Sequence, residues 1–361
     1  MAGQSARDSW LTGRLALAGQ TGTTRTFGGH VKVLITGAAG YIGSTVASAC
    51  LDSGITPVTL DSLVTGRREF ARGSAFYQGD ISDGALLDKM FAEHPDIAAV
   101  VHCAALIVVP ESVCDPVAYY YANVVKTLDL AQHMIRNGCH RLLFSSTGCF
   151  YQPGPDGSVD EDSPIQPASP YGRTKAVCEG MLADIAAGAP LRVVSLRYFN
   201  PIGADPKLRS GLQARCPSHA LGKLIEAHES GQPFPVSGTD YPTRDGSGIR
   251  DYVHVWDLAA AHVSALKRFD DVLGPATSIA INLGTGTGTT VRELVSAFNS
   301  VVDQPVATVD APRRPGDVTG AFTRTERARR LLNWQPRYTV ADAIADSLRW
   351  VAVRDEVLTG S

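Results

Sequence analysis

The sequence predicts an α/β fold, a doubly wound parallel sheet with helices on both faces. Three observations lead to this prediction. From Val31 onward short apolar runs alternate with longer amphipathic runs, the apolar runs are nearly uninterrupted, and a glycine-rich segment follows the first of them. Uninterrupted apolar runs are typical of strands that are buried on both faces, as they are in parallel sheets.

Seven strands and four helices are expected. The strands are 31–36, 56–61, 74–80, 98–104, 141–146, 191–197 and 278–286. The helices are 41–53, 84–93, 114–137 and 171–187. Because each helix lies between two of the strands, we expect parallel strands that are joined by helical crossovers.

Composition and charge restrict the functional class. The chain has 361 residues, of which 44% are hydrophobic, and this is enough for one large or two modest domains. A net charge of −3 gives no overall attraction to nucleic acid or to an anionic membrane, so we expect neither as a partner. No run of 18 apolar residues is present, and we expect no membrane-spanning helix.

Residues 1–30 are rich in glycine, threonine and arginine, and we expect a poorly ordered extension there. Their apolar piece, 15–18, is too short for the core of a signal peptide. The seven cysteines are scattered along the chain and show no C-x-x-C spacing. They indicate a reduced, cytoplasmic protein with neither a disulfide framework nor a metal site.

The composition changes after Arg197. Segments 199–211 and 235–248 are rich in proline, glycine and aspartate, as long loops are. We therefore predict two domains. The domain with the sheet comprises residues 31–199 with returning segments at about 250–285, and a smaller α/β substrate-binding domain comprises residues 200–249 and 286–361.

A glycine-rich turn joins the first strand to the first helix. In TGAAGYIG (36–43), Gly37, Gly40 and Gly43 have the spacing TGxxGxxG. Gly37 permits the tight turn, Gly40 lets the backbone approach a pyrophosphate, and Gly43 permits close helix packing. A purely structural turn is the alternative, but the strand before it and the helix after it favour a Rossmann-like dinucleotide site.

An acidic residue, Asp61, ends the second strand 18 residues after Gly43. Its carboxylate can accept hydrogen bonds from an adenosine ribose and would repel a 2′-phosphate, which favours NAD over NADP. Arg67 and Arg68 could hold such a phosphate, although we interpret them as solvated loop charges. Asp80, at the end of the third strand, could reach the adenine or could cap a turn.

Tyr171 and Lys175 lie one helical turn apart at the start of the fourth helix, so their side chains share one face. The end of the strand before this helix carries Ser145, Ser146 and Thr147, at the sheet edge where ligands bind. Nearby positive charge lowers the pKa of a phenol from its usual value of about 10. We predict that Tyr171 is the catalytic base, supported by Lys175, an oxidised nicotinamide ring and the Thr147 hydroxyl. A surface pair is the alternative, since YxxxK is common by chance.

Several segments together resemble those of a known family: TGAAGYIG, Asp61, GDIS, HCAAL, SST, SPYGRTK and LRYFNPIGA. They are similar to the extended short-chain dehydrogenase/reductases, and among these most similar to the UDP-glucose (UDP-galactose) 4-epimerases. The resemblance extends from Val31 to about Trp350, and its most specific segments are GTDYPTRDGSGIRDYVHVWDLA and APRRPGD. It implies an NAD-dependent isomerase of galactose metabolism that inverts C4 of a UDP-hexose through a 4-keto intermediate. It also implies a homodimer that is joined through two helices of each subunit.

The resemblance implies two sets of binding residues, beside the catalytic Tyr171, Lys175 and Thr147. The NAD site would comprise Gly37, Gly40, Tyr41, Ile42, Gly43, Asp61, Asp80, Ile81, Cys103, Ala104, Ala105, Asn123, Tyr171, Lys175 and Phe199. The UDP-sugar site would comprise Thr147, Asn200, Ser218, Val236, Arg250, Arg314, Asp317 and Ala321. Arginines suit this second site because a guanidinium makes bidentate contacts with a diphosphate.

Three residues depart from the family pattern. Ile107 replaces a lysine that is common near the cofactor, Ser218 replaces an asparagine, and Ala321 replaces a tyrosine that narrows the sugar pocket. We expect the space at Ala321 to admit a 2-acetamido group, so that UDP-N-acetylhexosamines are accepted with UDP-glucose and UDP-galactose. The alternative is that Phe322 or a neighbouring loop refills this space.

Other interpretations of the same motifs stay open. A nucleotide-sugar dehydratase or a UDP-glucuronate decarboxylase shares the fold, NAD and YxxxK, but such enzymes usually carry a carboxylate after the catalytic threonine. This chain has Gly148 and Cys149 there, so that proton shuttle is missing. A UDP-glucuronate 4-epimerase is a further alternative. A non-enzymatic NAD-sensing protein is the alternative of another class, although such proteins typically lose the tyrosine.

Overall fold

The computed structural model describes residues 31–215, 217, 219–313 and 318–359. The expectations for residues 1–30, and the predicted site residues Ser218, Arg314 and Asp317, lie outside these described residues. Within them, no helix is long and apolar enough to cross a membrane.

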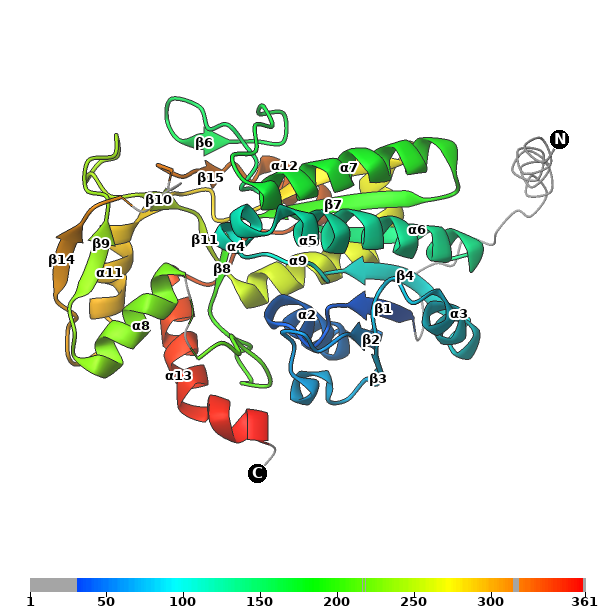
Figure 1. Ribbon diagram of the computed structural model, residues 1–361, viewed down its shortest axis with the longest axis horizontal. Helices are drawn as coiled ribbons and strands as arrows, with labels where there is room; N and C mark the ends of the chain where they lie inside the picture. The colour runs from blue at the N-terminus through cyan, green and yellow to red at the C-terminus, as the bar shows by residue number, and fades with distance from the viewer. Residues whose placement is uncertain (1–30, 216, 218, 314–317, 360–361) are drawn as a thin grey trace.

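The core of the protein is a sheet of seven parallel strands, which confirms the predicted fold class (Figure 1). Its strands are β1 (Lys32–Thr36), β2 (Thr56–Asp61), β3 (Ala75–Gln78), β4 (Ile97–His102), β5 (Arg141–Thr147), β7 (Arg192–Tyr198) and β12 (Ser278–Leu283). They lie in the order β12-β7-β5-β4-β1-β2-β3. The order reverses between β1 and β4, and ligands of open parallel sheets bind outside the carboxyl ends of the strands at such a reversal.

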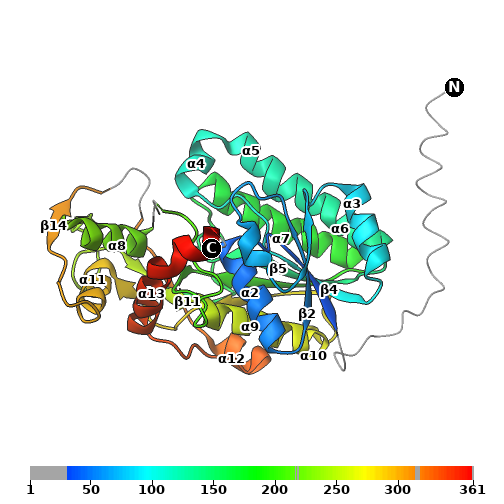
Figure 2. The ribbon, with the colours of Figure 1, turned by 90° about the horizontal axis from the view of Figure 1, so that it is seen from below.

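Helices cover both faces of the sheet (Figure 2). One face carries α2 (Tyr41–Asp52), α9 (Val255–Lys267), α10 (Phe269–Leu273) and α12 (Glu326–Leu332). The other face carries α3 (Gly84–Glu93), α6 (Lys126–Arg136) and α7 (Pro170–Gly188). Alternate residues of β1 serve the two cores, because Val33 and Ile35 pack in the first and Leu34 in the second.

The predicted helix 114–137 is interrupted in the structure. Its residues divide among the end of α4 (Val109–Cys114), α5 (Pro116–Tyr120), a π-helical turn η2 (Tyr121–Val125) and α6. Pro116 starts α5, and the side chain of Asp115 caps it by accepting from Ala118 N at 3.0 Å. Single π-helical turns inside helices occur frequently at functional sites, and this one carries Asn123.

A second lobe lies beside the carboxyl ends of the strands, at the left of Figure 1. It contains α8 (Ala220–Ser230), β9 (Phe234–Ser237), α11 (Val291–Asn299), β14 (Thr308–Ala311) and α13 (Val340–Thr359). Leu224, Phe234, Phe298 and Ile344 are fully or almost fully buried in its core. The domain boundaries near 199, 249 and 285 stay a prediction.

Short strand pairs and one 3-10 helix complete the fold. The pairs are β6 (Ser158–Val159) with β15 (Phe322–Thr323), β8 (Asn200–Ile202) with β11 (Tyr252–His254), β10 (Ile249–Arg250) with β13 (Thr289–Thr290), and β9 with β14. The 3-10 helix is η1 (Arg68–Ala71). The first pair joins the loop after β5 to the segment before α12, the second joins the loop after β7 to the segment before α9, and the third joins that last segment to the loop after β12.

Candidate active site

The glycine turn after β1 is packed so tightly that a side chain does not fit at Gly37 or Gly43. Gly37 has a φ of +69°, and a Cβ added there would lie 2.6 Å from Ala104 N. A Cβ on Gly43 would lie 2.2 Å from Gly37 O. Gly40 precedes α2 without a side-chain cap, and the first turn of that helix carries no acidic residue. The turn therefore presents backbone and a helix N-terminus to a ligand, which suits an anionic dinucleotide.

Asp61 lies at the end of β2, beside the glycine turn, as its predicted role requires. The carboxylate is almost fully buried and accepts from Ala39 N at 2.9 Å and from Leu63 N at 2.8 Å. Arg67 and Arg68 are exposed, and the Arg68 guanidinium lies over the ring of Phe76 at 5.1 Å.

Asp80 already has protein partners in the structure. One carboxylate oxygen accepts from the backbone and the hydroxyl of Ser82, so that Asp80 caps a turn. The other oxygen is paired with Lys126 Nζ at 2.5 Å. The side chain of Ile81, which follows, is buried in the second core. These contacts leave Asp80 partly exposed at the sheet edge.

Asn123 is fully engaged in connecting three segments. Its side chain accepts from Leu106 N at 2.8 Å and donates to Leu106 O at 2.9 Å and to Thr174 Oγ1 at 3.1 Å. It thereby fixes the segment after β4 against η2 and α7. That segment contains Cys103, Ala104 and Ala105, and its first two residues lie directly against Gly37.

Tyr171 and Thr147 meet at the start of α7. Ser169 caps this helix by accepting from Gly172 N at 3.1 Å, and Pro170 occupies its first position, which explains why α7 begins there. The Tyr171 side chain is buried, and burial raises the pKa of its phenol well above the usual value. A hydrogen bond from Thr147 acts in the opposite direction on the same pKa.

Lys175 lies one turn further along α7 and is directed at β5. Its Nζ donates to Ser145 O at 2.9 Å and lies 4.8 Å from the centre of the Phe144 ring. The side chain is almost fully buried, and this burial lowers the pKa of the ammonium. Ser145 also lies 3.2 Å, hydroxyl to thiol, from Cys103. The lysine is thus positioned by the same strand end that carries Thr147.

Phe199 and Ala321 share one small apolar cluster next to Thr147. Both pack against Phe150, Tyr151 and Val159, residues of the segment that follows β5. The ring of Phe199 lies so close to Gly148 that a Cβ on this glycine would be 2.4 Å from it.

Phe322 is directed elsewhere. Its ring contacts Gly288 and Gly157, where added Cβ atoms would lie 2.7 Å and 3.6 Å from it. The alternative in which Phe322 refills the space at Ala321 therefore receives no support from its position.

The predicted UDP-sugar residues of the second lobe are partly engaged with protein. Arg250 Nη1 donates to Ile249 O at 2.8 Å and to Thr319 O at 3.0 Å. The side chain of Val236 is fully buried in the core of the second lobe, so that only its backbone is suited to ligand contact. Asn200 N donates to Asp251 O at 3.0 Å. Ile107, the first departure from the family pattern, is 59% exposed.

Asp251 was not identified from the sequence, although it follows Arg250 directly. Its carboxylate is fully buried and accepts from the backbone and hydroxyl of Thr285, and from Thr323 N at 3.1 Å. Burial raises the pKa of this carboxyl to about 6. The sequence signal that could have identified Asp251 is its position as an acidic residue within the largely apolar segment IRDYVHV. Asp251 connects the strand of Arg250 to the segment next to Ala321.

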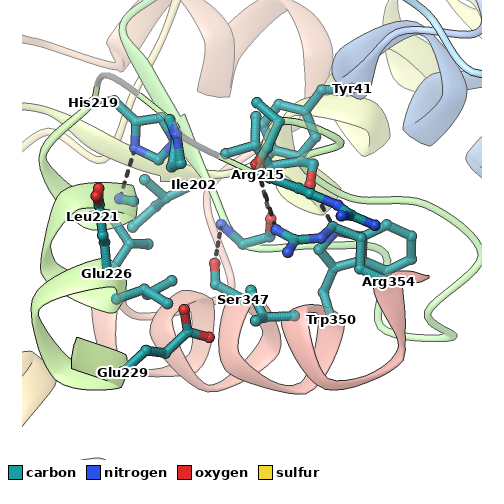
Figure 3. A pocket seen from close by; sticks show the side chains of 17 residues that line it. Tyr41, Ile202, Arg215, His219, Leu221, Glu226, Glu229, Ser347, Trp350 and Arg354 are labelled. Atoms are coloured by element: carbon teal, nitrogen blue, oxygen red, sulfur yellow. Dashed lines mark hydrogen bonds between the residues drawn. The ribbon is translucent and has the colours of Figure 1, made fainter. Parts of the chain in front are cut away.

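Tyr41, predicted to contact NAD, lines a pocket beside α13 (Figure 3). Its hydroxyl donates to Gly203 O at 2.6 Å, and Ser347 and Trp350 of α13 also line this pocket. Tyr171, Lys175 and Thr147 do not line it. Any contact of Tyr41 with a dinucleotide would therefore involve its backbone at the start of α2. Within the described residues, no group of three or more His, Cys, Asp or Glu side chains is placed to hold a metal ion.

The chain is similar to proteins of a known family. Residues 33–284 match the model of the NAD dependent epimerase/dehydratase family. A UDP-glucose 4-epimerase of Rhizobium meliloti is 41% identical over 326 residues, which cover 90% of this chain and 98% of the relative.

Two solved structures resemble the chain over most of its length. One is a UDP-glucose 4-epimerase from Stenotrophomonas maltophila with bound NAD and formylated UDP-arabinopyranose (TM-score 0.85, 36% identity, 92% of this chain and 100% of that chain). The other is the Bifidobacterium longum UDP-glucose 4-epimerase in complex with NAD⁺ and UDP (TM-score 0.81, 32% identity, 89% and 98%). The chain therefore belongs to the NAD dependent epimerase/dehydratase family, and its similar relatives within it are UDP-glucose 4-epimerases.

Proposed function

We propose that the protein is an NAD-dependent UDP-glucose 4-epimerase, which interconverts UDP-glucose and UDP-galactose through a 4-keto intermediate. The observation that carries the proposal is the meeting of Tyr171 and Thr147 at the end of β5, with Lys175 fixed to the same strand end. The UDP-glucose 4-epimerases to which the chain is similar support the choice of substrate. On this proposal the enzyme acts in galactose metabolism.

The glycine turn fits NAD, because Gly37 and Gly43 let its backbone pack tightly against Ala104 and on itself, and the start of α2 then presents free backbone N–H groups. Asp61 is placed to receive the adenosine ribose, beside the start of α2. When bound, NAD supplies the oxidation and reduction at C4 of the sugar and carries positive charge on its oxidised ring. The segment of Cys103, Ala104 and Ala105, fixed by Asn123, lies against this turn.

Tyr171 is the proton-transferring group. As a phenolate, its oxygen takes the proton of the 4-hydroxyl group and later returns it, and the Thr147 hydroxyl holds the same substrate oxygen. Protein burial alone keeps the phenol protonated, since burial raises its pKa. Positive charge from Lys175 and from bound NAD offsets this burial and prepares the phenol to act as a base.

The second lobe holds the nucleotide, while the sugar is held more loosely. Arg250, Asn200 and the backbone of Val236 would bind the UDP moiety, and the predicted partners Ser218, Arg314 and Asp317 lie outside the described residues. Firm binding of UDP with loose binding of the sugar lets the flat 4-keto sugar present either face.

The rival reactions are less well supported by the site. Gly148 and Cys149 follow Thr147, so the carboxylate that elimination of water needs is missing at this place. An NAD sensor would not need a buried Tyr171 hydrogen bonded to Thr147. A UDP-glucuronate 4-epimerase is distinguished by its substrate and is tested with the sugars named below.

An exposed apolar stripe supports a homodimer. Val109, Val113, Val117, Tyr121 and Val125 are spaced by four residues along α4, α5 and η2, and each is at least 40% exposed. Large aligned apolar stripes of this kind mark protein–protein contacts. The six described cysteines are free thiols, which is consistent with our proposal of a cytoplasmic protein.

Gly43→Ala should weaken NAD binding. The added methyl group meets Gly37 O, and overpacking of this kind costs about 1–3 kcal/mol, so the affinity should fall about 10- to 100-fold. Calorimetric titration with NAD measures this. Gly180→Ala is the matched control, because it also lies inside a helix and its added Cβ has nothing within 4 Å. Equal affinities in the two variants would contradict the placement of NAD.

Tyr171→Phe should reduce turnover of UDP-glucose by about 100- to 10,000-fold, the usual contribution of a positioned acid–base group. Bound NAD should remain, and Thr147→Ala should lose less activity. The assay follows UDP-galactose formation per NAD bound. Tyr119→Phe is the control, since it removes the hydroxyl of another buried tyrosine that bonds Val108. Near-full turnover of Tyr171→Phe with UDP-glucose, UDP-N-acetylglucosamine and UDP-glucuronate would disprove the base assignment.

Ala321→Tyr should exclude only the bulky sugar. The parent is expected to convert UDP-N-acetylglucosamine as well as UDP-glucose, because Ala321 carries only a methyl group where the family pattern has a tyrosine. A comparison of kcat/KM for UDP-glucose, UDP-N-acetylglucosamine and UDP-glucuronate in both proteins measures this. A parent that rejects the acetamido sugar would show that another group closes the pocket.

Val117→Asp should shift the protein from dimer to monomer in analytical ultracentrifugation, because a charge in an apolar interface is costly. Val64→Asp is the control, since Val64 is 78% exposed and Val117 77%. If the parent sediments as a monomer, the proposed dimer is wrong.

A further inference from the structure

Glu179 has no part in the site described above, although it lies one helical turn beyond Lys175 on the same face of α7. Its side chain is only 11% exposed. The carboxylate accepts from the hydroxyl of Ser146 and from the guanidinium of Arg197, with Arg197 Nε at 3.0 Å and 3.1 Å from its two oxygens. Glu179 is thus a buried anion with both oxygens occupied.

Arg197 extends this contact to two further segments, the one that follows β5 and strand β12. Its Nη1 donates to the Tyr151 hydroxyl at 2.5 Å and to Glu161 O at 3.3 Å. The Tyr151 hydroxyl in turn donates to Asn282 Oδ1 at 2.8 Å. The network therefore joins α7 to β5, β7, β12 and the segment that follows β5.

Glu179 is attached to β5 at Ser146, the residue directly before Thr147. Ser145 accepts from Lys175, Ser146 donates to Glu179, and Thr147 bonds Tyr171. Three consecutive residues of the strand end are each bound to α7, and Glu179 holds the middle one. Its release would free Thr147 to shift relative to the phenol, and a displacement of about 1 Å at reacting groups can cost about 100-fold in rate.

We propose that Glu179 is a positioning residue: its carboxylate, held in place by Arg197, fixes the end of β5 so that the Thr147 and Tyr171 hydroxyls meet. This inference rests on the proposed function, because it assigns a role in the reaction of those two hydroxyls. A purely stabilising ion pair is the competing account, since breaking a buried pair destabilises a protein wherever it lies.

The chain contains a matched control for that competing account. Asp270 pairs with Arg141 Nη2 at 2.8 Å and with Arg192 Nη1 at 2.6 Å. Arg141 and Arg192 start β5 and β7, the same two strands whose other ends carry Ser146 and Arg197. Asp270→Asn therefore weakens an ion pair on the same strands, remote from Thr147.

The test compares Glu179→Ala, Glu179→Gln, Ser146→Ala and Asp270→Asn with the parent protein. For each, kcat per bound NAD and KM for UDP-glucose are measured, together with the unfolding temperature. Glu179→Ala should lower kcat about 100-fold with KM nearly unchanged, because the lost alignment acts on the transition state. Glu179→Gln, which keeps the length and one acceptor, should recover to within about tenfold of the parent. Asp270→Asn should lower the unfolding temperature and leave kcat unchanged.

Ser146→Ala keeps the ion pair and should also lower kcat, which preserves the test if Glu179→Ala does not fold. An unchanged kcat in Glu179→Ala and Ser146→Ala, or a change in KM alone, would overturn the proposal. Crystal structures of the parent and Ser146→Ala give a readout that does not depend on activity. The Thr147–Tyr171 hydroxyl separation should exceed hydrogen-bond reach in the variant, and an unchanged separation would overturn the proposal. A parent that does not convert UDP-glucose would refute the proposed function alone.

Discussion

The site depends on the attachment of α7 to the end of β5. Helix and strand meet through polar groups inside an otherwise apolar core, where Lys175 Nζ binds Ser145 O and Tyr171 bonds Thr147. Buried polar groups of this kind are costly unless they are paired, so the pairs also fix the register between the two elements. Every other part of the site is arranged around this junction: the glycine turn lies at the reversal of strand order, and the second lobe lies beyond the strand ends.

Burial at this junction has opposite effects on the two ionisable groups. It raises the pKa of the Tyr171 phenol and lowers the pKa of the Lys175 ammonium, so both groups are driven toward their neutral forms. Tyr171 then keeps its proton in the protein by itself, so no phenolate is available to accept another. Positive charge brought by an oxidised cofactor would favour the phenolate, so that the form able to accept a proton is populated only when the cofactor is in place. Such coupling would limit proton transfer to the loaded enzyme.

Much of the fold was predictable because its signals are local. Each of the seven strands, and the glycine turn, is formed by a run of consecutive residues that can be recognised in the sequence. The Ser169–Pro170 pair likewise marks the start of α7. The helix 114–137 was predicted as one piece because its apolar spacing continues across Asp115 and Pro116, where the structure starts a new helix. The π-helical turn at Asn123 depends on partners in the segment after β4 and on α7, which no local pattern contains.

The candidate site divides in the same way. The positions of Tyr171, Lys175 and Thr147 follow from a motif and its place after a strand. The partners of Glu179 and Asp251 could not be predicted, because Arg197, Thr285 and Thr323 lie between 18 and 72 residues away. The direction of the Tyr171 pKa was also beyond the sequence. The spacing in the sequence places a lysine near the phenol. The degree of burial, which decides whether the phenol pKa is raised or lowered, is a property of the packed core.

The central claim is that the protein alone holds Tyr171 as a neutral phenol and that NAD makes it a base. Ultraviolet titration of the phenolate tests this most directly, as the difference between the parent and the Tyr171→Phe protein, with and without saturating NAD⁺. We predict no Tyr171 phenolate at neutral pH in the protein freed of NAD, and its appearance at lower pH once NAD⁺ is bound. A Tyr171 that ionises near neutral pH without NAD, or whose titration NAD⁺ leaves unchanged, would contradict the account.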